Sequence, residues 1–155
     1  MTPEAAAELG RLDPVMKKLI KKVGPIALKP ERRQSPYESL VSAVVYQQLT
    51  GKAAATILGR VKDLYAKKFP DPDDILKTRD EDFRAAGLSG AKTRAIKDIA
   101  AKALDGTVPT GRAIARLPDE EIIERLTSIR GVGPWTVEMM LIFKLRLMKF
   151  VCLNI

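Results

Sequence analysis

Apolar residues recur at intervals of three and four along almost the whole chain, and no stretch alternates apolar and polar residues long enough to predict a β-strand. That spacing places an apolar stripe along one face of a helix. The clearest case has its apolar positions at Ala54, Ile57, Leu58, Val61, Leu64 and Tyr65. We therefore expect an all-α protein whose core is built from helix faces.

Helix start and stop signals divide this pattern into segments. Ser, Thr and Asp side chains accept hydrogen bonds from the first free amides of a helix, proline is favoured at its first position, and glycine ends it. Gly24, Gly87 and Gly106 mark three such ends. We expect helices to begin at Asp13-Pro14, at the capping box of Ser35 and Glu38, after Gly51, at Asp71-Pro72, at a second capping box of Thr78 and Glu81, at Ser89, at Pro118-Asp119 and at Pro134.

Charge and the rare residues exclude several classes of site. The chain has 155 residues with 27 Lys and Arg against 19 Asp and Glu, and the formal charge of +8 favours a polyanionic partner. The absence of histidine excludes a histidine general base, a Ser-His-Asp triad and a histidine-ligated metal. The single cysteine, Cys152, excludes an intramolecular disulfide and a four-cysteine metal cluster, and indicates a reducing cytoplasm.

Membrane and export signals are not expected. The longest apolar runs, residues 40–46 and 139–143, are far shorter than the roughly 20 residues that a membrane-spanning helix needs. The first residues lack the basic and apolar regions of a signal peptide.

Residues 129–136, with the sequence IRGVGPWT, form the most informative segment. Gly131 and Gly133 let the backbone approach an anion closely. The helix that begins at Pro134 offers free amides, and Thr136 adds a hydroxyl donor. An ordinary tight turn between two helices explains the same glycines, but the basic charge of the chain favours phosphate binding. Such contacts hold a duplex without reading its sequence.

With its flanking motifs, this segment resembles a known family. Residues 129–136 resemble the helix-hairpin-helix of the HhH-GPD DNA glycosylase superfamily. Four further segments resemble its 3-methyladenine DNA glycosylase II branch: SPYESL (35–40), YQQLTGKAA (46–54), FRAAGLSGAKT (83–93) and WTVEMMLIF (135–143). The resemblance covers about residues 12–145, with the motifs in the family's order.

The resemblance implies a two-lobed, all-helical domain over residues 1–155 that lacks the last helices of the family. The implied lobes are about 1–35 and 36–145, followed by a divergent tail at 146–155. It also implies a hydrolase of base excision repair that acts on double-stranded DNA. Such an enzyme flips out an alkylated purine, 3-methyladenine or 7-methylguanine, and hydrolyses its N-glycosidic bond. We expect a cytoplasmic monomer with no membrane role, associated with the nucleoid in a bacterium.

The resemblance also assigns residues to the site. Bifunctional relatives have a Schiff-base lysine where this chain has Trp135, so a monofunctional enzyme is implied. An indole face stacks well on a flat, electron-poor alkylpurine. The implied base pocket consists of Trp135, Met139, Tyr46 and Tyr37, each of which is also compatible with a core position. Leu49, with Gln48 beside it, is expected to enter the duplex and fill the gap left by the flipped base.

The backbone contacts are assigned in the same way. The hairpin residues implied to hold DNA are Arg130, Gly131, Val132, Gly133, Pro134 and Thr136. Further basic residues expected near phosphates are Lys52, Lys92 and Arg94. In the family, main-chain carbonyls of the hairpin hold a monovalent cation, and the corresponding carbonyls here belong to Thr127, Ile129 and Val132. Na⁺ or K⁺ is the only ion implied, and no other cofactor is.

The chain departs from the family at the catalytic position. The family's catalytic aspartate falls on Ile155, next to Asn154, and no acidic residue follows Glu138. A cationic alkylpurine leaves without a general acid, which agrees with the absence of histidine, but the oxocarbenium-like sugar needs a negative charge nearby. No catalytic residue is therefore assigned, and we expect DNA binding with weak or no base excision. Two explanations of this departure stay open: a frameshift or sequence error after Leu145, and a divergent tail.

Two other classes of protein stay open. One is a non-catalytic HhH DNA-binding or lesion-sensing module, which base excision would distinguish from a glycosylase. The other is a helical interaction protein that uses Gly131 and Gly133 only as a turn, and DNA affinity that is insensitive to their substitution by alanine would favour it.

Overall fold

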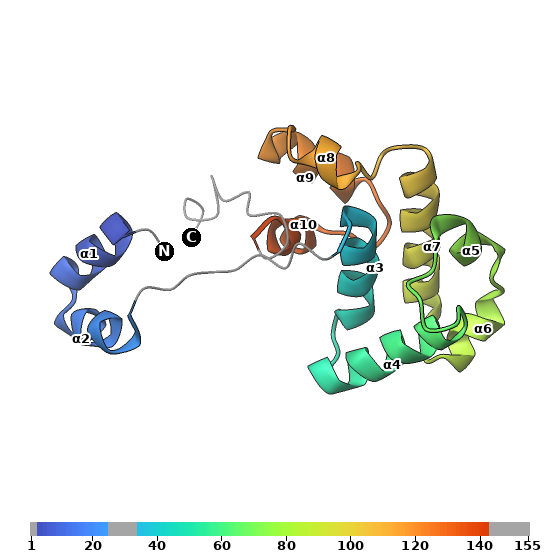
Figure 1. Ribbon diagram of the computed structural model, residues 1–155, viewed down its shortest axis with the longest axis horizontal. Helices are drawn as coiled ribbons and strands as arrows, with labels where there is room; N and C mark the ends of the chain where they lie inside the picture. Colours follow the sequence, from blue (N-terminus) through green and yellow to red (C-terminus); the bar gives the residue numbers. More distant parts are fainter. Residues whose placement is uncertain (1–2, 25–33, 143–155) are drawn as a thin grey trace.

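The computed structural model describes residues 3–24 and 34–142, and every regular element within these ranges is a helix (Figure 1). The prediction of an all-α protein is confirmed. The division into lobes at residue 35 stays a prediction. The helices are α1 (Pro3–Leu12), α2 (Pro14–Val23), α3 (Pro36–Tyr46), α4 (Gly51–Asp63), α5 (Pro72–Lys77), α6 (Asp80–Ala85), α7 (Gly90–Leu104), α8 (Gly111–Ile114), α9 (Asp119–Thr127) and α10 (Pro134–Met140).

Most helix starts lie where the capping residues predict them. The Asp13 carboxylate accepts hydrogen bonds from the amides of Val15 and Met16. Ser35 and Glu38 form the expected reciprocal capping box, with donor–acceptor distances of 3.2 and 2.7 Å. These contacts involve neighbours in sequence only, which is why the sequence alone predicts them.

The second predicted capping box is wrong. Helix α6 begins at Asp80 after Arg79, and no side chain caps it. The Thr78 hydroxyl instead donates to the Asp74 carbonyl at 2.8 Å and lies 2.6 Å from the Tyr65 hydroxyl. Thr78 therefore closes the preceding helix, because the fold brings Tyr65 beside it. Helices α1 and α8 were not expected, and α4 ends at Asp63, two residues earlier than its apolar spacing suggests.

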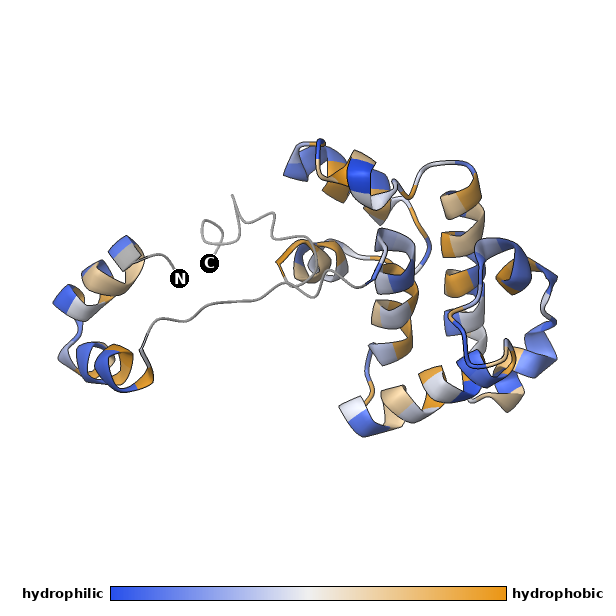
Figure 2. Ribbon diagram, viewed as in Figure 1, coloured by the Kyte–Doolittle hydropathy of each residue, from blue (hydrophilic) through white to orange (hydrophobic). Residues whose placement is uncertain are grey.

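The core lies among α3, α4, α7, α9 and α10. Helix α3 packs against α4, α7 and α10, while α7 also packs against α5 and α6. One broad face of α3 is fully buried through Leu40, Val41, Val44 and Val45. Apolar residues gather on the facing sides of α3 and α7 (Figure 2). Helix α3 therefore has one face in the core and another free to form a site.

Helices α1 and α2 pack against each other, and α2 buries none of its residues. The apolar side chains of Val15, Leu19 and Val23 are exposed, together with Leu12 of α1. None of the described helices combines the length and apolarity needed to cross a membrane.

Candidate nucleic-acid interface

The turn between α9 and α10, residues 129–133, is called the hairpin below. Ile129 and Val132 point into the core, whereas Arg130 is exposed. Gly131 has φ +75°, and a Cβ at this position would lie 3.0 Å from the Cβ of Ala95 on α7. Glycine is required here for both reasons, because a side chain would be strained in this conformation and would collide with α7.

The hairpin offers unused main-chain donors. Among the described residues, the amides of Gly131, Gly133 and Trp135 donate no hydrogen bond, while the Arg130 amide donates to a carboxylate oxygen of Asp98 at 2.7 Å. Unpaired amides around glycines form a site that can accept an anion.

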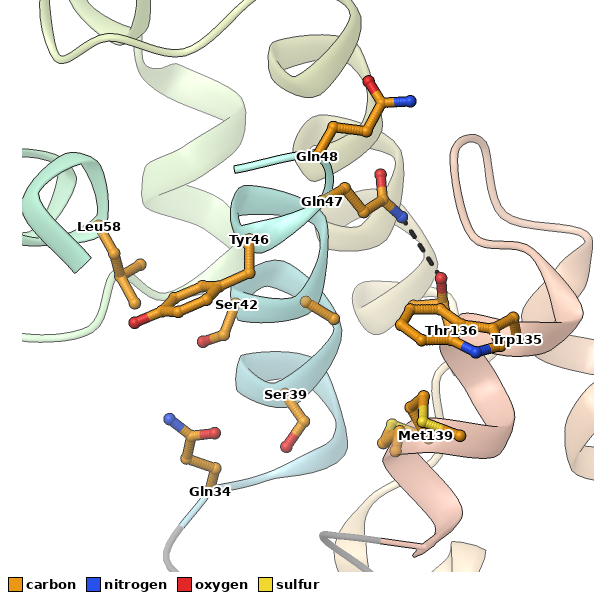
Figure 3. A pocket seen from close by; sticks show the side chains of 12 residues that line it. Gln34, Ser39, Ser42, Tyr46, Gln47, Gln48, Leu58, Trp135, Thr136 and Met139 are labelled. Carbon is orange, nitrogen blue, oxygen red and sulfur yellow. Dashed lines mark hydrogen bonds between the residues drawn. The ribbon is translucent and has the colours of Figure 1, made fainter. Parts of the chain in front are cut away.

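Thr136 faces the protein rather than the surface. Its amide donates to the Gly133 carbonyl at 3.0 Å, and its side chain is buried. Its hydroxyl accepts a hydrogen bond from the side-chain amide of Gln47 at 3.4 Å (Figure 3). The structure therefore differs from the expectation that Thr136 presents a hydroxyl to a phosphate, because the end of α3 occupies that side.

The connection from α3 to α4, residues 47–50, is called the wedge loop below. Gln47 donates to the Gly131 carbonyl at 3.0 Å and so ties this loop to the hairpin. Gln48 has a φ of +56°, and Leu49 leaves 39% of its surface exposed. Leu49 and Gln48 are thus presented at the surface beside the hairpin, and their insertion into a duplex stays a prediction.

Lys92 turns its ammonium group toward the protein. Its ammonium group donates to the main-chain carbonyls of Val45 and Gln47, each at 2.8 Å, and burial lowers the pKa of this lysine. The structure therefore favours a structural role for Lys92 over the expected phosphate contact, because the fold places the end of α3 against the start of α7. Lys52 is exposed in the first turn of α4.

Basic side chains do gather beside the hairpin. Arg94, Lys97 and Arg130 line a cavity of about 550 Å³ together with Asp98 and Ser128. Lys97 is paired with Asp80. Arg94 and Arg130 therefore remain as cations that could meet a phosphate at this edge.

A second cavity, of about 610 Å³, lies between α3 and α10. Tyr46 and Leu58 form one wall, while Trp135 and Met139 form the opposite wall (Figure 3). Trp135 is 67% exposed, so its indole is not a core side chain. The structure thus brings together three of the four residues expected at the pocket.

Tyr37, the fourth, lies elsewhere. Its hydroxyl donates to the Pro70 carbonyl at 3.1 Å, and its ring meets the edge of Phe69 at 6.0 Å between centroids. Burial raises the pKa of this phenol. Nine residues separate Tyr37 from Tyr46, which turns the two side chains about 180° apart around α3. Tyr37 therefore belongs to the core side of the helix and not to the pocket.

Three polar residues of the pocket were missed at the sequence level. Gln34 Oε1, Ser39 Oγ and Ser42 Oγ are buried and have no hydrogen-bond partner within the described residues. All three side chains line the 610 Å³ cavity. Ser39 and Ser42 share one helical face with Tyr46, and that spacing was the signal that could have found them.

The carbonyls of Thr127, Ile129 and Val132, which the family resemblance assigns to a monovalent cation, have free lone pairs. The Ile129 carbonyl accepts one hydrogen bond, from the Val132 amide at 3.1 Å, which leaves a second lone pair. Within the described residues, the Thr127 and Val132 carbonyls accept none. The described side chains form no cluster of acidic or cysteine residues for a metal. The tail, with Cys152, Asn154 and Ile155, lies outside the described residues.

A comparison with known families decides the affiliation of this fold. The family model of the HhH-GPD superfamily base excision DNA repair proteins matches residues 41–147, which include the wedge loop and the hairpin. The chain belongs to the HhH-GPD superfamily.

Several similar proteins within this superfamily are named 3-methyladenine DNA glycosylases. DNA-3-methyladenine glycosylase 1 of Schizosaccharomyces pombe is 44% identical over 149 residues, which are 92% of this chain and 63% of the relative. The structure of the Schizosaccharomyces pombe 3-methyladenine DNA glycosylase in complex with abasic DNA matches with a TM-score of 0.79 at 43% identity, over 92% of this chain and 70% of that one. The structure of a Bacillus halodurans DNA-3-methyladenine glycosidase matches with a TM-score of 0.77 at 32% identity, over 94% of this chain and 65% of that one. The chain thus spans about 63% of the first of these relatives.

Proposed function

We propose that this chain recognises alkylated purines in duplex DNA by taking the flipped base into the cavity between α3 and α10, and that it hydrolyses their N-glycosidic bond slowly. The observation that carries this proposal is the position of Trp135. Its side chain forms part of the cavity wall, while its amide, two residues after the hairpin, is one of the unused donors. One residue therefore connects a turn that can bind the DNA backbone with a pocket that has room for a base.

Phosphate binding is supported by the hairpin. Two glycines and Trp135 present unused amides, and the exposed Arg130 adds a positive charge. A phosphate held at such a turn fixes the register of the duplex on the protein.

Base binding is supported by the two walls of the pocket. The exposed indole of Trp135 can stack on a base, and a cationic alkylpurine is further attracted by the π face of the ring. The unpartnered oxygens of Gln34, Ser39 and Ser42 supply hydrogen-bonding groups for the polar edge of the base. Leu49 would fill the gap that the base leaves in the duplex.

A Na⁺ or K⁺ ion held by the carbonyls of Thr127, Ile129 and Val132 is part of the proposal. Such an ion would supply positive charge at the hairpin next to a bound phosphate. The free lone pairs of these carbonyls fit that role.

Slow hydrolysis follows from the residue at the family's catalytic position. The side chains of Ile155 and Asn154 provide no negative charge for the oxocarbenium-like sugar. This same observation favours the second candidate function, a lesion-binding module without excision.

Single-turnover release of 3-methyladenine and 7-methylguanine from methylated duplex DNA tests the proposal. We expect slow release by the chain, faster release by Ile155→Asp, and tighter binding of a duplex with one lesion than of the undamaged duplex. Lesion-selective binding without release in either protein would favour the second candidate. Equal binding of damaged and undamaged duplexes would overturn both.

A further inference from the structure

Helix α7 contacts the wedge loop and the hairpin through residues on successive turns of one side. Lys92 contacts the end of α3 and the wedge loop, Ala95 lies against Gly131, and Asp98 accepts the Arg130 amide. Residues three apart lie above one another on a helix. A single rigid element thus reaches both parts of the candidate DNA interface.

At one end, Lys92 caps α3. The last carbonyls of a helix lack amide partners, and the dipole gives them negative character, so a cation there is stabilising. Lys92 supplies that cation to Val45 and Gln47 at 2.8 Å, in a partly buried position. The Gln47 carbonyl belongs to the wedge loop, so the bond fixes the direction in which the chain leaves α3.

At the other end, the hairpin sits directly on α7. The 2.7 Å hydrogen bond from the Arg130 amide to Asp98 holds the hairpin on α7. The close contact of Gly131 with Ala95 leaves no room for the hairpin to come nearer to this helix.

Gln47 completes the arrangement. Its side-chain amide donates to the Gly131 carbonyl at 3.0 Å, while its own carbonyl accepts from Lys92. The wedge loop, the hairpin and α7 are therefore each bonded to the other two.

We propose that Lys92 is a positioning residue for lesion recognition, because it holds Leu49 at a fixed offset from the phosphate-binding hairpin. This inference rests on the proposed function. A duplex held at the hairpin then meets Leu49 at one defined base step. Leu49 can therefore help to unstack the base at that step without a prior rearrangement of the wedge loop. Lys92 acts through the wedge loop and touches no DNA itself.

The test compares Lys92→Met with Lys92→Arg in the full chain. The matched control is Lys102→Met, which removes a lysine at the far end of α7 that pairs with Asp105. Affinity is measured for a duplex with a tetrahydrofuran abasic site and for the same duplex undamaged. Fluorescence of 2-aminopurine beside the abasic site reports unstacking. Circular dichroism and thermal melting monitor the fold.

We expect Lys92→Met to lower the ratio of the two affinities about tenfold and to reduce the fluorescence change, while undamaged-duplex affinity stays within about twofold. Lys92→Arg should restore most of the ratio, and Lys102→Met should leave it unchanged. If Lys92→Met fails to fold, Gln47→Leu takes its place, and we expect the same fall in the ratio of the two affinities.

Three results would overturn the inference: an unchanged ratio, a parallel fall of both affinities, or an equal loss in Lys102→Met. Failure of the proposed function looks different, because the wild-type chain itself would then show no preference for the abasic duplex.

Discussion

Gly131 of the hairpin and Ala95 of α7 are in contact so close that a methyl group added at Gly131 would lie 3.0 Å from the Ala95 side chain. The φ of +75° adds strain for any other residue. We expect Gly131→Ala to lower the free energy of unfolding by about 1–3 kcal/mol. Urea denaturation measures this change.

Gly133→Ala is the matched control for that experiment. A Cβ at Gly133 meets no atom within 4 Å, and its φ of −94° is ordinary. The substitution should change stability by less than about 0.5 kcal/mol. Equal effects of the two substitutions would contradict the contact with Ala95.

Trp135→Ala should separate binding from stability. The indole is 67% exposed, so we expect little change in melting temperature. Loss of base stacking, worth about 1–3 kcal/mol, should weaken binding of lesion-containing duplex about tenfold or more. Leu104→Ala removes a similarly exposed apolar side chain (52%) far along α7 and should alter neither property. A large drop in melting temperature for Trp135→Ala would show that the indole is a core residue.

Ser39→Ala should not destabilise the protein. Its buried hydroxyl has no partner in the described structure, so removing it deletes an unpaired polar group. Thr93 is the control, because its buried hydroxyl donates to the Ser89 carbonyl at 3.1 Å, and Thr93→Val should cost about 1 kcal/mol. We further expect Ser39→Ala to weaken binding of a lesion-containing duplex. Thermal melting and fluorescence anisotropy give the two readouts, and stability loss in Ser39→Ala equal to that in Thr93→Val would argue against a free hydroxyl.

Tyr37 should make stability fall at alkaline pH. Burial raises its pKa above the ordinary value of 10.0, so the unfolded chain releases this proton first. The stabilisation that the protonated phenol gives the folded state is complete below about pH 10 and is lost as the pH rises further. Tyr37→Phe should therefore be less stable than wild type by about 1 kcal/mol at pH 8, from the lost bond to Pro70. The difference should shrink toward pH 11, as measured by urea unfolding at both pH values, and a constant difference would refute the assignment.

The sequence predicted those parts of the structure that depend on near neighbours. The caps at Asp13, Ser35 and Ser89 bond to amides two or three residues away, so their pattern is visible in the sequence. Thr78 has the same pattern, but Tyr65 and Asp74 engage its hydroxyl. The difference is a tertiary contact that no local motif encodes.

The candidate site shows the same division. Trp135 and Met139 reach the pocket because the hairpin motif fixes where α10 begins. Tyr37 could have been placed from the sequence, because it stands three, four and seven residues before Leu40, Val41 and Val44 and so shares their apolar face of α3. Lys92 was assigned to phosphate because its carbonyl partners lie more than forty residues away in the chain.

The inward direction of Lys92 bears on how salt should affect DNA binding. Each side chain that neutralises a phosphate releases condensed counterions, and the slope of log affinity against log salt falls by about 0.9 per contact. The ammonium group of Lys92 is bonded to two carbonyls, so we expect it to release none. Undamaged-duplex binding should thus keep its slope in Lys92→Met and lose about one unit in Arg130→Met. Lys92 therefore counts toward the formal charge of +8 without adding a phosphate contact.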